Sequence, residues 1–266
     1  MQVEYQETHK DLKKRIDLHS QYGSRDIDAW MLDVLSPENG IRILDVACGA
    51  GKQLEAFHEY LGGDAEIVGG DVSEELLEQA RKLGAEMGGA FEVVELDFDR
   101  RFEFDDGDFD LVSCCFAIYY TADIPFTVGE MSRVLKPGGR LFTTGPMPAN
   151  KMLFYDVIRA ATGAEIPPMP GSSRYSTEIF DAIRDEFSAV ELHEFENPLE
   201  FNEVEPFVEY VRASLSEDRR LWKGLFESAG EFESVIQKIE TEAERRLEAE
   251  GELIMTKVVG GFVGTK

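Results

Sequence analysis

Residues 41–145 alternate short apolar runs with segments that carry apolar residues at helical spacing. Such alternation is typical of parallel strands joined by helices that cover both faces of one sheet. It therefore predicts a doubly wound α/β fold. The expected strands are Ile41–Val46, Glu66–Asp71, Phe91–Leu96, Phe109–Ala117 and Arg140–Gly145, and the expected helices are Lys52–Leu61, Ser73–Leu83 and Phe126–Leu135.

Segments on either side of this alternating region have a different pattern. Residues 146–175 are rich in Pro and Met and predict an irregular loop, whereas 203–250 have an apolar stripe at helical spacing. We also expect a helix at Thr177–Asp185 and strands at Ala189–Glu196 and Glu252–Val259. The resulting division is a helical lid (1–40), an α/β core (41–202) with a cap loop (146–175), a helical cap insertion (203–250) and a final core strand (251–266).

The charge of the chain limits its partners. It carries 53 acidic and 27 basic residues, a net charge of −26. Nucleic acids and anionic membranes both require a basic surface, so we expect neither as a partner. The acidity fits either adaptation to a high-salt habitat or simple solubility. The N-terminal stretch Met1–Lys14 lacks the apolar core of a signal peptide, and the longest apolar run, Leu111–Tyr120, is short, so we expect a soluble cytoplasmic protein.

Cysteine and histidine spacing gives no sign of a metal site or a disulfide framework. The three cysteines are Cys48, Cys114 and Cys115, and neither C-x-x-C nor H-E-x-x-H occurs. The acid-rich stretch 105–110 also lacks the spacing of a calcium loop. We therefore expect no metal.

The segment Ile43–Gly51, ILDVACGAG, is the strongest functional signal. An apolar strand leads into a glycine-bearing loop from which a helix begins, and such a loop lets a ligand approach the backbone closely. Asp71 follows 20 residues after Gly51, where Rossmann-type sheets place the acid that binds a ribose. A dinucleotide fingerprint would need a third glycine at position 54, which is Leu.

The DVACGAG stretch resembles motif I of the class I S-adenosylmethionine-dependent methyltransferases. Three further segments resemble that family in the expected order: Glu95-Leu-Asp97 at the third strand, Asp108-Phe-Asp-Leu-Val112 at the fourth, and Glu130-Met-Ser-Arg-Val-Leu-Lys-Pro-Gly-Gly139 before the fifth. The set is most similar to the quinone-biosynthesis C-methyltransferases. The resemblance implies a Rossmann-like seven-stranded sheet with an antiparallel seventh strand, a helical substrate cap, and S-adenosylmethionine as cofactor.

The resemblance also implies roles for individual residues. An acid suits the cationic amino-acid part of the cofactor, Asp71 binds the ribose, and the carbonyl of Cys115 or Phe116 accepts from the ammonium group. Val72 packs on the adenine, and Asp97 and Phe98 flank its edge. Tyr22 and Arg25, in the lid, are candidate contacts to the cofactor carboxylate. The expected cofactor-binding set is Asp45, Ala47, Gly49, Gly51, Asp71, Val72, Asp97, Phe98, Cys115, Phe116, Tyr22 and Arg25.

Catalysis would be methyl transfer by in-line displacement, for which positioning and a dry site matter most. Where the family often has His-His this chain has Tyr119-Tyr120, so these are the candidate catalytic residues and the identity of a general base stays open. His19 is a further lid candidate. Aromatic and Met residues in 146–175 and 203–250 favour a small, apolar or aromatic acceptor. The alternatives are a cofactor-binding sensor or scaffold without turnover, and an NAD(P)-dependent oxidoreductase.

Overall fold

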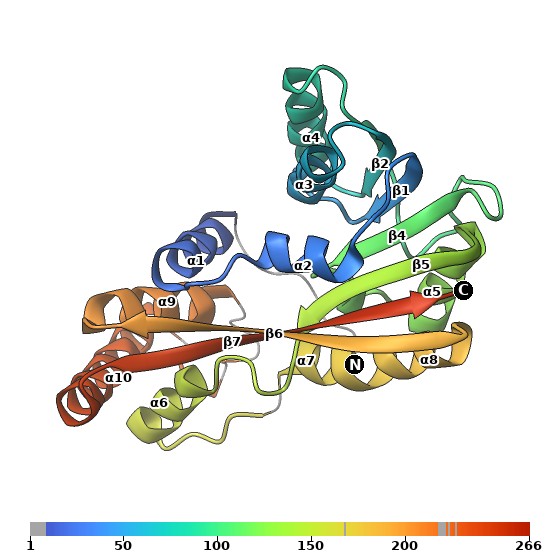
Figure 1. The fold of residues 1–266 in the computed structure, drawn as a ribbon. Coiled ribbons are helices and arrows are strands. Elements are labelled where there is room, and N and C mark those ends of the chain that lie inside the picture. Colours follow the sequence, from blue (N-terminus) through green and yellow to red (C-terminus); the bar gives the residue numbers. More distant parts are fainter. Residues whose placement is uncertain (1–8, 168, 218–221, 223, 227) are drawn as a thin grey trace.

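A computed structural model describes residues 9–167, 169–217, 222, 224–226 and 228–266. Its centre is a seven-stranded sheet of order β3-β2-β1-β4-β5-β7-β6, in which β7 is antiparallel to both neighbours (Figure 1). The strands are β1 Ile41–Val46, β2 Ala65–Asp71, β3 Glu92–Glu95, β4 Phe109–Cys115, β5 Leu135–Pro146, β6 Ala189–Phe201 and β7 Leu253–Thr265. The Rossmann-like fold expected from the sequence, with its antiparallel seventh strand, is confirmed.

Helices cover both faces of the sheet. The helices are α1 His9–Tyr22, α2 Ile27–Leu35, α3 Lys52–Tyr60, α4 Glu74–Glu86, α5 Ile124–Val134, α6 Met152–Thr162, α7 Pro170–Arg174, α8 Phe180–Glu186, α9 Val204–Glu217 and α10 Ala229–Glu250, with short η1 Ile118–Tyr120 and η2 Tyr175–Ile179 turns. Side chains of α2, α3 and α4 share one apolar cluster with β1 and β2. Side chains of α5, η2 and α8 share another with β4 and β5. Adjacent Cys114 and Cys115 point to opposite faces accordingly, and all three cysteines are free.

The long strands β6 and β7 position the remaining helices. They pair over 13 residues, but only Val259–Thr265 of β7 also pairs with β5, so the rest continues as a two-stranded ribbon beyond the sheet. Figure 1 shows α1, α6, α9 and α10 gathered around this ribbon. These helices and the ribbon enclose a third apolar cluster, which includes the predicted stripe Val235, Ile236, Ile239 and Ala243.

Two expectations about these outer segments are wrong. Residues 146–175 are not irregular throughout, because 152–162 form helix α6, whose buried Phe154, Val157 and Ile158 lie at helical spacing. The prolines that suggested a loop lie outside this helix. The last strand extends to Thr265, six residues past the expected end, because its glycines 260, 261 and 264 admit neighbouring aromatic side chains such as Phe142 and Phe187. Residues 1–8 of the expected lid, and 168, 218–221, 223 and 227 of the expected cap, lie outside the described residues.

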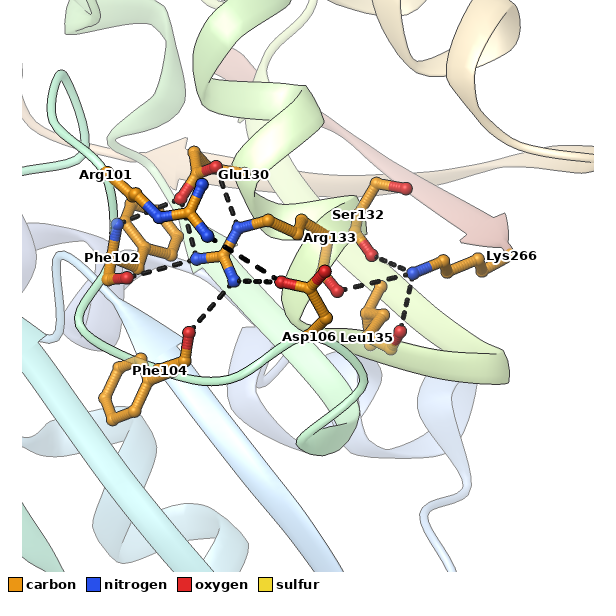
Figure 2. A network of polar contacts seen from close by, with 9 residues as sticks. All are labelled: Arg101, Phe102, Phe104, Asp106, Glu130, Ser132, Arg133, Leu135 and Lys266. Atoms are coloured by element: carbon orange, nitrogen blue, oxygen red, sulfur yellow. Dashed lines mark hydrogen bonds and ion pairs between the residues drawn. The ribbon is translucent and has the colours of Figure 1, made fainter.

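Arg133 fixes the amino-terminal edge of the sheet. Its guanidinium donates to both carboxylate oxygens of Glu130, at 2.9 and 2.8 Å, to Asp106 at 2.7 Å, and to the carbonyls of Phe102 and Phe104 (Figure 2). Glu130 also accepts from the Phe102 amide. Glu130 holds the pKa of Arg133 above its usual range, and Arg133 lowers the pKa of Glu130. This network holds the helix-free connection between β3 and β4 against α5.

Lys266 closes the same edge, since its Nζ donates to the carbonyls of Ser132 and Leu135 at 2.5 and 2.7 Å (Figure 2). A cation at the carboxyl end of α5 suits the helix dipole. None of the helices among the described residues has the length and apolarity that a bilayer crossing requires.

Candidate functional site

The loop from β1 to α3 lies at the carboxyl edge of the sheet. Ala47, Gly49 and Gly51 have φ angles of 59°, 56° and 90°, all in the left-handed region. A Cβ at Gly49 would have no heavy atom within 4 Å, so its backbone is accessible from outside. At Gly51 a Cβ would meet Ala80 at 3.2 Å, and this glycine therefore also lets α3 approach α4.

Asp71, the last residue of β2, joins this loop to the next strand. Its carboxylate accepts from the Gly49 amide at 2.9 Å and from the Ser73 amide at 2.9 Å. The side chain of Val72 is 63% exposed and presents an apolar surface beside that carboxylate. Ser73 caps α4 as expected, since its Oγ accepts from the Leu76 amide.

The turn after β3 is anchored by its second acid rather than its first. Asp99 accepts from the Thr121 hydroxyl and from the Ala122 amide, and the Phe98 carbonyl accepts from Thr127 Oγ1 at 3.0 Å. Asp97 accepts only from the Asp99 amide and pairs with exposed Arg100 at 3.1 Å. Because Asp99 is committed to the anchor, Asp97 is the acid that stays at the edge of the site.

Asp45 is the acid buried beneath the loop. It is 2% exposed, and Ser113 Oγ donates to it at 2.6 Å. Burial raises the pKa of Asp45 to about 7, and nearby Asp71 raises it further against the effect of Ser113. A carboxyl group at this depth is therefore poised to ionise when a cation binds beside it.

The end of β4 supplies the opposite wall. Phe116 has a φ of 58°, and its amide donates to the Thr144 carbonyl at 3.0 Å. The two tyrosines follow in η1, with ring centroids 4.7 Å apart. Tyr119 is 8% exposed, and its carbonyl accepts from Arg174 at 3.0 Å.

These elements surround a cavity of about 860 Å³. Seven of the residues predicted for the site line it, namely Asp45, Ala47, Cys115, Phe116, Tyr119, Tyr120 and Arg25. The remaining seven lie outside its lining, namely Gly49, Gly51, Asp71, Val72, Asp97, Phe98 and Tyr22. Except for Tyr22, these outer residues follow β1, β2 and β3 along the sheet edge, on the adenosine side of the expected site. The cavity therefore corresponds to the methionine and acceptor side.

The lid residues take different positions. Tyr22 packs its ring against Phe201, with centroids 4.9 Å apart, and belongs to the third apolar cluster. Arg25 lines the cavity, where it donates to the Glu196 carbonyl at 2.7 Å and stacks on Phe195. Asn197 holds the segment in place by accepting from the Ser24 and Arg25 amides and donating to the Arg25 carbonyl.

Sequence reasoning missed several cavity residues. Asn197, Lys151 and Lys257 all line it, and none belongs to a recognisable motif. His19 lies there too, beside Tyr210, with a buried Nδ1 that makes no hydrogen bond within the described part of the chain. Among the residues that the structure describes, no group of three His, Cys, Asp or Glu side chains could hold a metal ion.

Residues 43–139 match a family model described as "Methyltransferase domain". Over this region the chain is 32% identical to nocamycin O-methyltransferase from Saccharothrix syringae, along 47% of this chain and 44% of that protein. It is 31% identical to a ubiquinone/menaquinone biosynthesis C-methyltransferase from Saccharophagus degradans, along 42% of this chain and 45% of that protein. The chain thus spans less than half the length of these relatives.

Two solved structures share the fold. A putative methyltransferase from Bacillus halodurans has a TM-score of 0.58 at 19% identity, covering 90% of this chain and 98% of that one. The YcgJ protein of Bacillus subtilis has a TM-score of 0.57 at 16% identity, covering 90% and 97%. The chain has the class I methyltransferase fold, its residues 43–139 are a methyltransferase domain that resembles the quinone-biosynthesis group, and the cofactor of that domain is S-adenosylmethionine.

Proposed function

We propose that this chain, with its methyltransferase domain at residues 43–139, is an S-adenosylmethionine-dependent methyltransferase that acts on a small molecule with an apolar or aromatic part. The observation that carries the proposal is the buried acid Asp45 at the floor of a cavity that adjoins an open glycine loop. Carboxylates at such depth are stable only when neutral or paired, and the cofactor is cationic at its sulfonium and ammonium groups.

The chain's own residues fit that cofactor. The Asp71 carboxylate has lone pairs left for two ribose hydroxyls after accepting from Gly49 and Ser73. Exposed Val72 offers a flat apolar surface for the adenine, and Asp97 lies at the end of the next strand. The left-handed Phe116 is our candidate for the carbonyl that accepts from the ammonium group.

When bound, the cofactor supplies an already activated methyl group, so the chain has to orient the acceptor and exclude water. We infer that the lid 1–40, the segment 146–175 and the insertion 203–250 serve as the cap. Phe154, Tyr155, Tyr210 and Trp222 bring aromatic rings from these segments to the cavity, opposite Tyr119 and Tyr120. Either tyrosine hydroxyl is placed to orient a polar acceptor, or its ring to stack on a flat one.

Calorimetric titration with S-adenosylhomocysteine tests the cofactor assignment. Asp71→Ala should weaken binding tenfold or more, because two hydrogen bonds to a charged group contribute about 1.5–3 kcal/mol each. Asp33→Ala, which removes an exposed acid of α2, is the matched control and should bind as the parent does. An unchanged dissociation constant for Asp71→Ala would exclude the ribose role.

Turnover tests the enzyme assignment against the two alternatives. A panel of small molecules is incubated with S-adenosylmethionine, and released S-adenosylhomocysteine is measured. A sensor or scaffold would bind the cofactor and release none, whereas an oxidoreductase would bind NAD(P) in a parallel titration.

A further inference from the structure

The cavity reverses the charge balance of the molecule. The whole chain has 53 acidic and 27 basic residues. Around the cavity the lining contains five Lys or Arg residues and three Asp residues. The five are Arg15, Arg25, Lys52, Lys151 and Lys257. A chain this acidic places a local excess of cations only where some interaction favours it.

The three acids of the lining do not neutralise the far end of the cavity. Asp26 caps α2 by accepting from the Asp28 and Ala29 amides. Asp28 pairs with Lys52 at 2.6 Å. Asp45 lies under the glycine loop and is bonded to Ser113. Each acid is therefore committed close to the cofactor side.

Lys151 and Lys257 lie together at the junction of β5, α6 and β7. The Lys151 amide donates to the Thr256 carbonyl at 2.9 Å, so the two lysines extend from neighbouring backbone. Lys257 Nζ is 5.3 Å from the centroid of the Phe116 ring, and Lys151 Nζ is 5.4 Å from that of Phe154. Both side chains are half-buried, and no described carboxylate is within ion-pair distance of Lys257.

The electrostatic environment of this corner is strongly positive. Burial, followed by the charges of Arg15 and Lys151, lowers the pKa of Lys257 to about 8. Burial together with Lys257, Lys151 and Arg15 lowers the pKa of His19 to about 2. Gathering cations away from water is unfavourable unless an anion shares the site. Phosphates and carboxylates are the anions that lysine and arginine bind best.

We propose that the methyl acceptor carries an anionic group, a carboxylate or a phosphate, which binds between Lys257, Lys151 and Arg15. Its apolar or aromatic body then lies against Phe154, Tyr155 and Trp222, which line the same cavity. This narrows the substrate class and rests on the proposed function only for the identification of the ligand as the acceptor. The site lies on α1, α6 and β7, beyond the β1 and β4 ends that serve the cofactor.

A binding experiment on the whole chain tests this without turnover. Benzoate and phenyl phosphate are titrated calorimetrically, each with and without saturating S-adenosylhomocysteine. Benzamide, which matches benzoate in shape but has no charge, is the neutral probe. The variants are Lys257→Met and Lys151→Met, and Lys82→Met is the control because Lys82 is an exposed lysine of α4 whose loss changes net charge equally.

At least one anion should bind tenfold or more tightly than benzamide, with and without S-adenosylhomocysteine. Lys257→Met and Lys151→Met should each weaken that binding about tenfold, and Lys82→Met should leave it unchanged. The tighter of the two anions identifies carboxylate or phosphate as the preferred group. A thermal melt of each variant shows that it is folded.

Three results would overturn the proposal. The first is equal binding of benzoate, phenyl phosphate and benzamide, or no binding of any. The second is unchanged anion binding in Lys257→Met. The third is displacement of the anion by S-adenosylhomocysteine together with weaker S-adenosylhomocysteine binding in Lys257→Met, which would assign the cations to the cofactor's own carboxylate. Failure of the proposed function looks different, since S-adenosylhomocysteine would then not bind while the anions still do.

Discussion

Arg133 and Lys257 lie at opposite edges of the same sheet and show two ways of burying a cation. Arg133 donates to two carboxylates and two carbonyls, and its partners raise its pKa (Figure 2). Lys257 has cations and an aromatic ring as its described neighbours, and its pKa is lowered. A charge whose hydrogen bonds are satisfied within the chain stabilises the fold, whereas a desolvated charge among like charges points to a ligand.

The comparison is broken most severely by removing Arg133. Arg133→Met leaves Glu130, a side chain that is 10% exposed, without its cation. Breaking a buried pair from one side costs about 3–5 kcal/mol. We expect that loss in the free energy of unfolding, measured by urea denaturation. The control is Arg81→Met, which breaks the exposed pair with Glu74 and should change stability by about 1 kcal/mol or less.

Asp45→Asn should have the opposite sign at alkaline pH. The pKa of Asp45 in the folded chain is about 7, above its ordinary value of 3.8, so its ionisation opposes folding as pH rises between these values. The shift sets an upper limit of roughly 4 kcal/mol at pH 8, and we expect about half of it, because the amide must also be hydrogen bonded there.

Thermal melts of Asp45→Asn and the parent should coincide near pH 4 and separate by pH 8, with the variant more stable. The same variant should lose affinity for S-adenosylhomocysteine, whose ammonium group favours ionised Asp45. Asp33→Asn, at an exposed position, is the control and should follow the parent at both pH values. A variant that is less stable than the parent at pH 8 would contradict the charge penalty.

Lys257→Met sharpens the comparison by a smaller amount. The lowered pKa of Lys257 means that its charge opposes folding fully below pH 8, and the penalty disappears as pH rises past the ordinary value of 10.5. After allowance for the partial exposure of the side chain we expect a gain of about 1–2 kcal/mol at pH 7. Urea denaturation at pH 7 and pH 10 measures it, and the gain should shrink at the higher pH.

The two edges also differ in how far the sequence could predict them. Glu130 and Arg133 belong to one contiguous motif, and Asp45, Gly49 and Asp71 follow strands whose carboxyl ends must meet. Arg15, Lys151 and Lys257 are more than 100 residues apart in sequence, and only the long β6–β7 ribbon and the packing of α1 and α6 bring them together. Periodicity predicts elements but not the distance that a strand extends past its sheet, so an apolar acceptor was the natural expectation.

Salt should have the smallest effect, and the structure changes where that effect comes from. The sequence suggests repulsion within 97–110, which holds seven acids and two arginines. In the structure most of these acids have partners, such as Arg42 for Asp108, Lys136 for Asp110 and Arg133 for Asp106. The remaining repulsion is therefore spread over the surface, where the Debye length falls from about 10 Å at 0.1 M salt to about 3 Å at 1 M. We expect the thermal midpoint to rise by a few degrees, on the order of 1 kcal/mol, between 0.05 and 1 M NaCl. Arg133→Met should show the same slope from a lower midpoint, because a buried network is screened little. A midpoint that stays flat or falls would mean that exposed ion pairs such as Arg212–Glu233 offset the repulsion.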